Sequence, residues 1–242
     1  MAINTPFTNI LPNPSNAYSN SGQDLGNNLG AGFSFVKLSS EHKINNTRTN
    51  SGRLISRDLS GHKWNIDIGY NPLTRDEFDP IYSFLLQSRG SMKPFFVSLP
   101  QYASPKNETF NASTTYRNSL SPIAATSAPG LTNMLVTATS YTTSSGTPSP
   151  GDIFTISDTD SNHTKAYRVT KVETPTDYTD DPGANNLRVH FIPALQRQVS
   201  SSATLTFKNP LFRVILKNDV QEESLNAENL YNFSLKLEEA QK

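Results

Sequence analysis

The run of local structure between residues 53 and 102 constrains this chain more than any other segment. Within it, residues 63–70 alternate strictly between polar or small residues and large apolar or aromatic ones. The members of the apolar face are Trp64, Ile66, Ile68 and Tyr70. A period of two is typical of a strand with one buried face. Because the turn-forming pair Ser60-Gly61 precedes it, residues 53–58 and 63–70 are predicted to form a hairpin.

A capped amphipathic helix is predicted next, over about residues 75–89. Thr74 and Glu77 have the spacing of a capping box, and Phe78 begins an apolar face with helical spacing. Pro80 is unfavourable in a second helical turn, since it lacks an N–H and its ring clashes with the preceding turn. The alternative is a helix that starts at this proline, with the preceding aspartate as its cap. The capping box and a hydrophobic staple agree on Thr74, which favours the earlier start.

Composition excludes several classes of protein. The chain has 242 residues, with 21 basic and 21 acidic side chains and no cysteine. The charge balance gives no basic excess of the kind that nucleic-acid binding requires, so no nucleic-acid partner is predicted. The lack of cysteine excludes disulfides, thiolate metal sites and thiol catalysis. No apolar run approaches the ~18 residues of a membrane span, and no secretory signal is expected at the N-terminus.

The pattern along the chain predicts four regions. Residues 1–30 are rich in Asn, Pro, Ser and Gly, which indicates either an arm that docks onto a partner or a disordered tail. Residues 31–102 and 209–242 are predicted to form one discontinuous β domain, closed by a strand over 230–237. The proline-containing stretch 103–130 is interpreted as a linker. Residues 131–208 are predicted to form a small inserted module of short strands.

The fold class is therefore predicted to be mainly β. It comprises a discontinuous barrel- or sandwich-like domain with one flanking helix, and a small inserted all-β barrel or sandwich. The strands predicted for the inserted module are 134–141, 152–157, 165–173, 187–192 and 203–208.

No motif in the sequence predicts catalysis or a cofactor. Asp158, Asp160 and Asn162 have the spacing that begins a calcium loop, but His163 and Val169 stand where such a loop needs Gly and Glu. A polar turn explains the same residues, so no metal is predicted. The histidines lack zinc-site spacing, and neither a nucleophile elbow nor a phosphate-binding glycine loop occurs. The chain is predicted not to be an enzyme.

Two groups of segments form a recognisable pattern of core and turn residues. The first group is GHKW, then NPLTRDEFDPIYSFLLQSRG and FFVSLP. The second group is PGDIFTIS, HTKAYRVTKV, LRVHFIPAL and NPLFRVIL, followed near the C-terminus by NLYNFSLKLEEA. Together these segments resemble minor tail proteins of long-tailed bacteriophages, namely the distal-tail and related baseplate proteins. The resemblance covers roughly residues 50–240.

The resemblance implies a tail-tube-related β domain that assembles as a ring, commonly hexameric, and links the tail tube to tip or fibre proteins. It also implies a place in the virion tail, after synthesis in the host cytoplasm. The residues considered as structural or interface candidates are Phe7, Ile10, Leu11, Tyr18, Trp64, Tyr70, Thr74, Glu77, Phe78, Tyr82, Arg89, Tyr231 and Phe233.

Three other functions stay open at this point. One is a receptor- or carbohydrate-binding module of a phage tail, in which tyrosines would form a stacking platform. Its candidate residues are Tyr116, Tyr141, Tyr167 and Tyr178. Another is a tail tube or terminator ring component. A hydrolase acting on the cell wall is the third, and no motif supports it.

Overall fold

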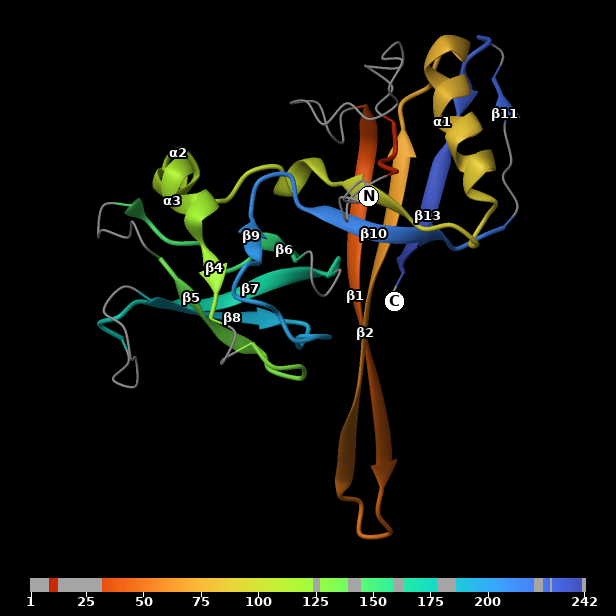
Figure 1. The fold of residues 1–242 in the computed structure, drawn as a ribbon. Coiled ribbons are helices and arrows are strands. Elements are labelled where there is room, and N and C mark those ends of the chain that lie inside the picture. Colours follow the sequence, from red (N-terminus) through yellow and green to blue (C-terminus); the bar gives the residue numbers. More distant parts are fainter. Residues whose placement is uncertain are drawn as a thin grey trace, which may run out of the picture. The chain divides into compact units, whose positions relative to one another are not determined.

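The chain folds into two units, each built around a β-sheet (Figure 1). The first unit consists of residues 1–31 and 95–213, and the second of residues 32–94 and 214–242. The computed structural model describes residues 9–12, 32–123, 127–138, 145–158, 163–177, 186–219, 224–226 and 228–240. The fold is mainly β, as predicted.

The sheet of the second unit is antiparallel and begins with a long two-stranded ribbon. Strand β1 (Phe33–Arg48) pairs with β2 (Leu54–Tyr70) along its whole length. Strand β13 (Ser234–Glu239) then pairs with β2, and the last three residues of β10 (Leu211–Leu216) pair with β13. Two short strands, β11 (Ser224–Leu225) and β12 (Tyr231–Asn232), form a separate antiparallel pair.

The predicted hairpin with a turn at Ser60-Gly61 is wrong. Residues 54–70 form one continuous strand, and the turn lies at residues 49–53, where Gly52 has a φ of 82° and donates to the Thr49 carbonyl at 2.8 Å. The register shifts between Lys43, which faces Gly61, and the next residue of β1, which faces Asp58. The small residues near position 60 therefore form a β-bulge, which absorbs extra residues without reversing the chain.

The predicted helix is confirmed as α1 (Arg75–Ser88). The Glu77 carboxylate accepts hydrogen bonds from the Thr74 N–H at 2.9 Å and from its hydroxyl at 2.8 Å. Pro80 lies inside the helix, so the start at Thr74 is correct. Phe78 is buried and stacks on Tyr231, with ring centroids 4.4 Å apart. These contacts fix α1 on the C-terminal part of the chain, beside β13 (Figure 1).

The first unit holds a six-stranded antiparallel sheet that is nearly closed into a barrel. Its strand order is β4-β5-β8-β7-β6-β9. The two end strands approach each other where the Leu205 N–H donates to the Leu120 carbonyl at 3.1 Å. The strand bounds are β4 (Ser121–Pro122), β5 (Asn133–Thr137), β6 (Ile153–Ser157), β7 (Ala166–Glu173), β8 (Asn186–Ile192) and β9 (Thr204–Thr206).

An aromatic cluster fills this barrel. The rings of Phe154 and Phe191 pack edge to face with centroids 5.8 Å apart, and Tyr167 stacks on Phe154 at 5.6 Å. Along β8, the buried Leu187, Val189 and Phe191 alternate with more exposed residues, as is typical of a barrel strand. In β6, by contrast, all residues from Ile153 to Ile156 are buried. Large buried aromatic groups account for much of the stability of a small barrel.

The stretch predicted as a linker is part of the first unit. After β3 (Phe95–Ser98) and the short η2 (Pro100–Tyr102), its described residues form helices α2 (Glu108–Ala112) and α3 (Thr114–Ser119). Phe110 and Tyr116 insert into the barrel core. The linker prediction failed because a low average hydrophobicity concealed these two anchoring side chains. The Asn107 side chain caps α2 by accepting from the Phe110 N–H.

Candidate functional site: an exposed hairpin arm

The distal part of the β1–β2 ribbon, residues 42–57, is the most unusual surface of the second unit. We call these residues the arm. Strand β13 supports β2 only between Asn65 and Gly69, so the arm consists of two strands and their turn (Figure 1). Every residue of the arm is exposed except Thr49, which is partly buried. An isolated two-stranded hairpin is marginally stable at best in water.

The arm carries apolar side chains that nothing in its own unit covers. Ile44 and Leu54 are each 54% exposed, and Ile55 is 50% exposed. Because Leu54 pairs with Arg48 and Ile55 pairs with Thr47, the alternation of the strands places Ile44 and Leu54 on one face and Ile55 on the other. Both faces of the arm therefore present apolar area together with polar groups, as protein contact surfaces do.

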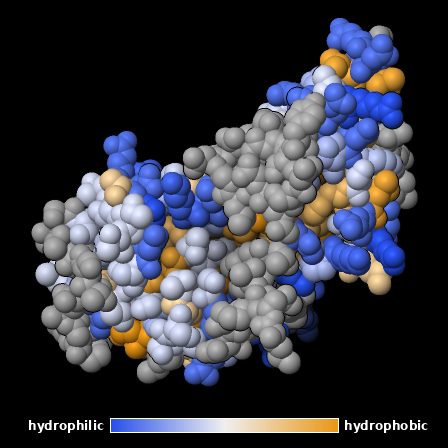
Figure 2. All heavy atoms as spheres, turned by 45° about the horizontal axis from the view of Figure 1, so that its top comes forward, coloured by the Kyte–Doolittle hydropathy of each residue, from blue (hydrophilic) through white to orange (hydrophobic). Residues whose placement is uncertain are grey.

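The surface shown in Figure 2 does not have one dominant apolar face. Hydrophobic residues appear there as separate patches among hydrophilic residues. Single exposed apolar side chains are ordinary on a folded surface. The arm differs because its three exposed aliphatic side chains lie on a ribbon that has no core beneath it.

The arm is also strongly basic. Residues 42–57 contain Lys43, Arg48, Arg53 and Arg57 and no acidic residue. None of the three arginines forms an ion pair with a side chain that the structure describes. A partner that covers the arm should therefore offer both apolar area and negative charge.

A polar and aromatic cluster holds the root of the arm. His42 and His62 face each other across the strands with ring centroids 4.8 Å apart, and the Ser40 hydroxyl lies 3.1 and 2.9 Å from their Nε2 atoms. His62 also packs edge to face on Trp64 at 4.6 Å. The Trp64 N–H donates to the buried carboxylate of Glu239 at 3.2 Å. The ribbon thus leaves the sheet from a fixed base.

Six of the thirteen residues singled out as interface candidates lie in or against the core of the second unit. Trp64, Tyr70, Phe78 and Phe233 are buried, and Tyr82 and Tyr231 pack against Phe78. Thr74 and Glu77 form the helix cap, and Arg89 is exposed in a left-handed conformation at the end of α1. The sequence reasoning missed the arm, because the polar residues 43–50 fit a loop as well as a strand. The signal that could have found it is the run of cations without an acidic residue.

The N-terminal candidates divide between described and undescribed residues. Ile10 and Leu11 are buried in the first unit, where the Leu11 N–H donates to the Phe96 carbonyl at 2.8 Å. Ile10, Phe96 and Leu211 form a small apolar cluster. Phe7 and Tyr18 lie outside the described residues.

Two of the proposed stacking tyrosines are not available to a ligand. Tyr116 and Tyr167 are buried in the barrel core, and Tyr141 and Tyr178 lie outside the described residues. The platform therefore loses half of its members.

The candidate calcium loop is represented by only one of its residues. Both oxygens of the buried Asp158 carboxylate accept hydrogen bonds from Ser200, one from the N–H and one from the hydroxyl, each at 2.9 Å. Asp160 and Asn162 lie outside the described residues. The part of the chain that the structure describes contains no group of three or more metal-binding side chains. Asp158 therefore serves to hold the barrel together.

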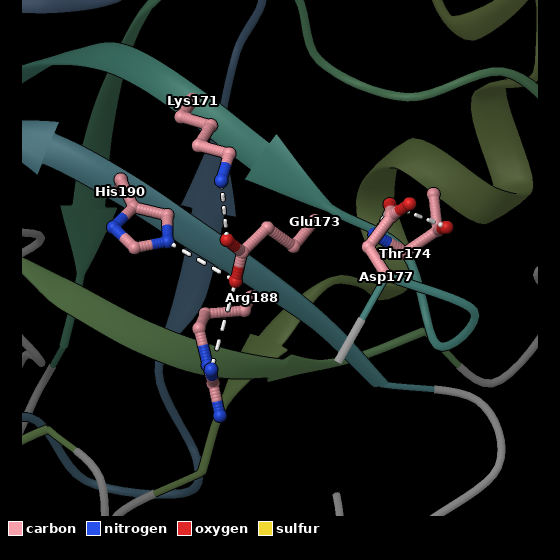
Figure 3. Close-up of polar contacts among 6 residues, drawn as sticks. All are labelled: Lys171, Glu173, Thr174, Asp177, Arg188 and His190. Carbon is pink, nitrogen blue, oxygen red and sulfur yellow. Dashed lines mark hydrogen bonds and ion pairs between the residues drawn. The ribbon is translucent and has the colours of Figure 1, made fainter. Parts of the chain in front are cut away.

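A charged cluster lies on the outer face of the barrel, across β7 and β8 (Figure 3). The Glu173 carboxylate contacts Lys171 Nζ at 2.6 Å, His190 Nε2 at 3.3 Å and Arg188 Nη1 at 3.6 Å. Hydrogen bonds from Lys171 and His190 hold the pKa of Glu173 below its usual range. An ionised, fully contacted carboxylate is a poor proton donor, so this cluster is suited to a structural or recognition role.

The neighbouring turn is closed in a similar way. The Thr174 N–H and hydroxyl donate to Asp177 Oδ2 at 2.7 and 2.8 Å (Figure 3). These bonds lower the pKa of Asp177 and order the turn that follows β7.

In the described residues, no helix has the length and apolar character needed to cross a membrane.

Sequence comparison finds similarity to a phage tail protein. No protein-family model matches the chain. The sequence is 26% identical over 213 residues to the distal tail protein pb9 of Escherichia phage T5, and the alignment covers 87% of this chain and 93% of pb9. The similarity thus extends over nearly the whole of both chains and supports a phage protein of the distal-tail type.

Proposed function

We propose that this chain is a structural protein of a bacteriophage tail that forms a closed ring at the distal tail or baseplate. In that position it joins the tail tube to tip or fibre proteins. The near full-length similarity to a distal tail protein supports the placement in the tail. The observation that supports assembly into a ring is the arm, a ribbon with exposed apolar side chains on both faces.

The energetics of the arm indicate how much of the interface it supplies. Full burial of an Ile or Leu side chain contributes about 1.5–3 kcal/mol, so covering the half-exposed Ile44, Leu54 and Ile55 contributes roughly 3 kcal/mol per contact. Association costs at least about 4 kcal/mol in lost translational and rotational freedom. The arm therefore stabilises a contact between copies but needs further surface beside it.

The expected symmetry follows from the shape of this surface. The arm and the surface that binds it are two different patches of the same subunit. Each copy therefore contacts one neighbour through its arm and the other neighbour through the surface that binds an arm. Head-to-tail contacts of this kind close into rings when the rotation between copies is suitable. The resemblance to distal tail proteins favours six copies, and the barrel unit is then available for contacts with other tail proteins.

Two measurements test this function. The purified full-length chain, studied by light scattering and negative-stain electron microscopy, is expected to form closed rings of uniform size. Antibody labelling of virions is expected to mark the distal end of the tail. A chain that stays monomeric at all concentrations, together with virions that carry no label, would overturn the proposal.

A further inference from the structure

The charges of the second unit are separated between the arm and the remainder. The arm carries four cations and no acidic residue, whereas residues 32–41, 58–94 and 214–242 contain 8 basic and 12 acidic residues. The net charge of the arm is thus matched by an equal and opposite charge on the rest of the unit. This separation makes the surface of one copy complementary to that of another.

The exposed face of α1 combines negative charge with apolar area. Asp76, Asp79, Ser83 and Leu86 are exposed and recur at helical spacing, so they form one stripe along the helix. Leu86 is 53% exposed, and Met92 just beyond the helix is 71% exposed. Asp79 shares an ion pair with Arg75 at 3.3 Å, but both side chains are largely exposed, and such pairs contribute little. The stripe is acidic at its first turn and apolar at its last.

The arm repeats this arrangement with the opposite charge and a similar spacing. Ile44 and Arg48 lie on the same face of β1, about 13 Å apart along the strand. Asp76 and Leu86 are about 15 Å apart along the helix axis. An arm laid along the stripe can therefore place a cation at the acidic turn and an aliphatic side chain at the apolar turn simultaneously.

This match cannot be made within one copy. The arm extends away from α1 of its own unit (Figure 1). Nucleic acid would satisfy the cations, but a phosphate backbone gives no cover to Ile44, Leu54 and Ile55. The combined charge and apolar pattern favours a second copy of this chain.

We infer that the arm of one copy docks along the exposed stripe of α1 in a neighbouring copy, with Arg48 facing Asp76 and Asp79. This inference rests on the proposed ring and identifies its two contacting surfaces. Because charge pairs contribute to the contact, assembly should weaken as the salt concentration rises.

A charge-exchange experiment on the full-length chain tests this pairing. One variant carries Arg48→Glu and Arg53→Glu, a second carries Asp76→Lys and Asp79→Lys, and a third combines all four changes. The matched control places Arg168→Glu and Lys208→Glu on exposed positions of the first unit. Analytical ultracentrifugation at low and high salt measures assembly, and circular dichroism verifies that each variant is folded.

The expected result is that each two-site variant raises the apparent dissociation constant at least tenfold, that the combined variant restores assembly, and that the control matches the wild type. Wild-type rings that are insensitive to both exchanges would overturn this pairing and leave the ring proposal standing. An arm variant that disrupts assembly without rescue by the helix variant would assign the arm to another surface and also overturn the pairing. Absence of wild-type rings would overturn both proposals.

A separate measurement covers the nucleic-acid alternative. Fluorescence anisotropy with a labelled DNA duplex is expected to show no difference between the wild type and the Arg48→Glu, Arg53→Glu variant. DNA binding that this variant abolishes, with ring assembly unchanged, would assign the arm to a polyanion and overturn the docking on α1.

Discussion

The barrel of the first unit and the arm of the second unit differ in where their side chains find cover. In the barrel, Phe154, Tyr167 and Phe191 are buried against one another, and the end strands meet through a backbone hydrogen bond. In the arm, two strands pair along their length, yet nearly every side chain is exposed. Backbone pairing alone therefore does not decide whether side chains are buried. The barrel buries its side chains within one chain, whereas burial of the arm requires a partner chain.

The largest effect that separates the two regions is expected from a core substitution. Phe154→Ala should lower the free energy of unfolding of the barrel by about 3–5 kcal/mol, because it removes a fully buried ring from an aromatic cluster. Urea titrations followed by circular dichroism and by the fluorescence of Trp64, the only tryptophan, can distinguish the units. The circular dichroism signal should show a transition at lower urea concentration, whereas the midpoint of the Trp64 fluorescence transition should stay unchanged. Equal shifts in both signals would mean that the units unfold together.

Acidification should weaken the barrel by a somewhat smaller amount. Burial lowers the pKa of His163 to about 4 from its ordinary 6.5, and its Nε2 lies 2.7 Å from the Tyr167 hydroxyl. The unfolded chain therefore binds a proton that the folded chain does not, so the stabilising contribution is complete above pH 6.5 and is lost as pH falls toward 4. The loss is roughly 3 kcal/mol at one pKa unit per 1.36 kcal/mol.

The control for this pH effect is His163→Gln, which cannot titrate. Carboxylates contribute equally to the acid sensitivity of the wild type and of the His163→Gln variant. The difference between their two curves of stability against pH therefore isolates the contribution of the histidine. Denaturant titrations between pH 7 and pH 4 that give parallel curves would contradict the assignment.

A smaller effect is expected at the root of the ribbon. Gly69 faces Phe35 across the strands, and a Cβ at position 69 would lie 2.1 Å from Phe35 Cε1. Gly69→Ala should destabilise the second unit by about 0.5–1.5 kcal/mol, because the half-exposed Phe35 ring has to turn out of its preferred rotamer to make room. The measurement is Trp64 fluorescence in urea. The double variant with Phe35→Ala should recover part of the loss, and no recovery would place the strain elsewhere.

The smallest effect on stability should come from the arm itself. Ile44→Ser with Ile55→Ser should change the free energy of unfolding of the isolated subunit by less than about 0.5 kcal/mol, since both side chains are already half exposed. The same variant should lose ring assembly in light scattering. A strong loss of subunit stability would show that these residues pack within their own chain, and the contrast between arm and barrel would fail.

Particular residues show why some of the fold could be predicted from the sequence and some could not. The short strands of the barrel were found because alternation and turn signals are local. The helices that contribute Phe110 and Tyr116 were missed because they lie in a polar, proline-containing stretch. The interface candidates Trp64, Tyr70, Phe78 and Phe233 were chosen for their size and aromatic character, which core residues share with interface residues.

The sequence by itself determined α1 and the buried face of β2. The cap formed by Thr74 and Glu77 and the alternation from Trp64 to Tyr70 depend only on neighbours within a few residues. Only the tertiary structure decided that Ser60-Gly61 lies within a continuous strand, and that residues 42–57 extend from the sheet as an arm. The reason is that strand pairing joins residues far apart in the chain, such as Phe33 and Tyr70. Pairing with the whole length of β1 keeps β2 extended through Ser60-Gly61, although these two residues alone favour a turn.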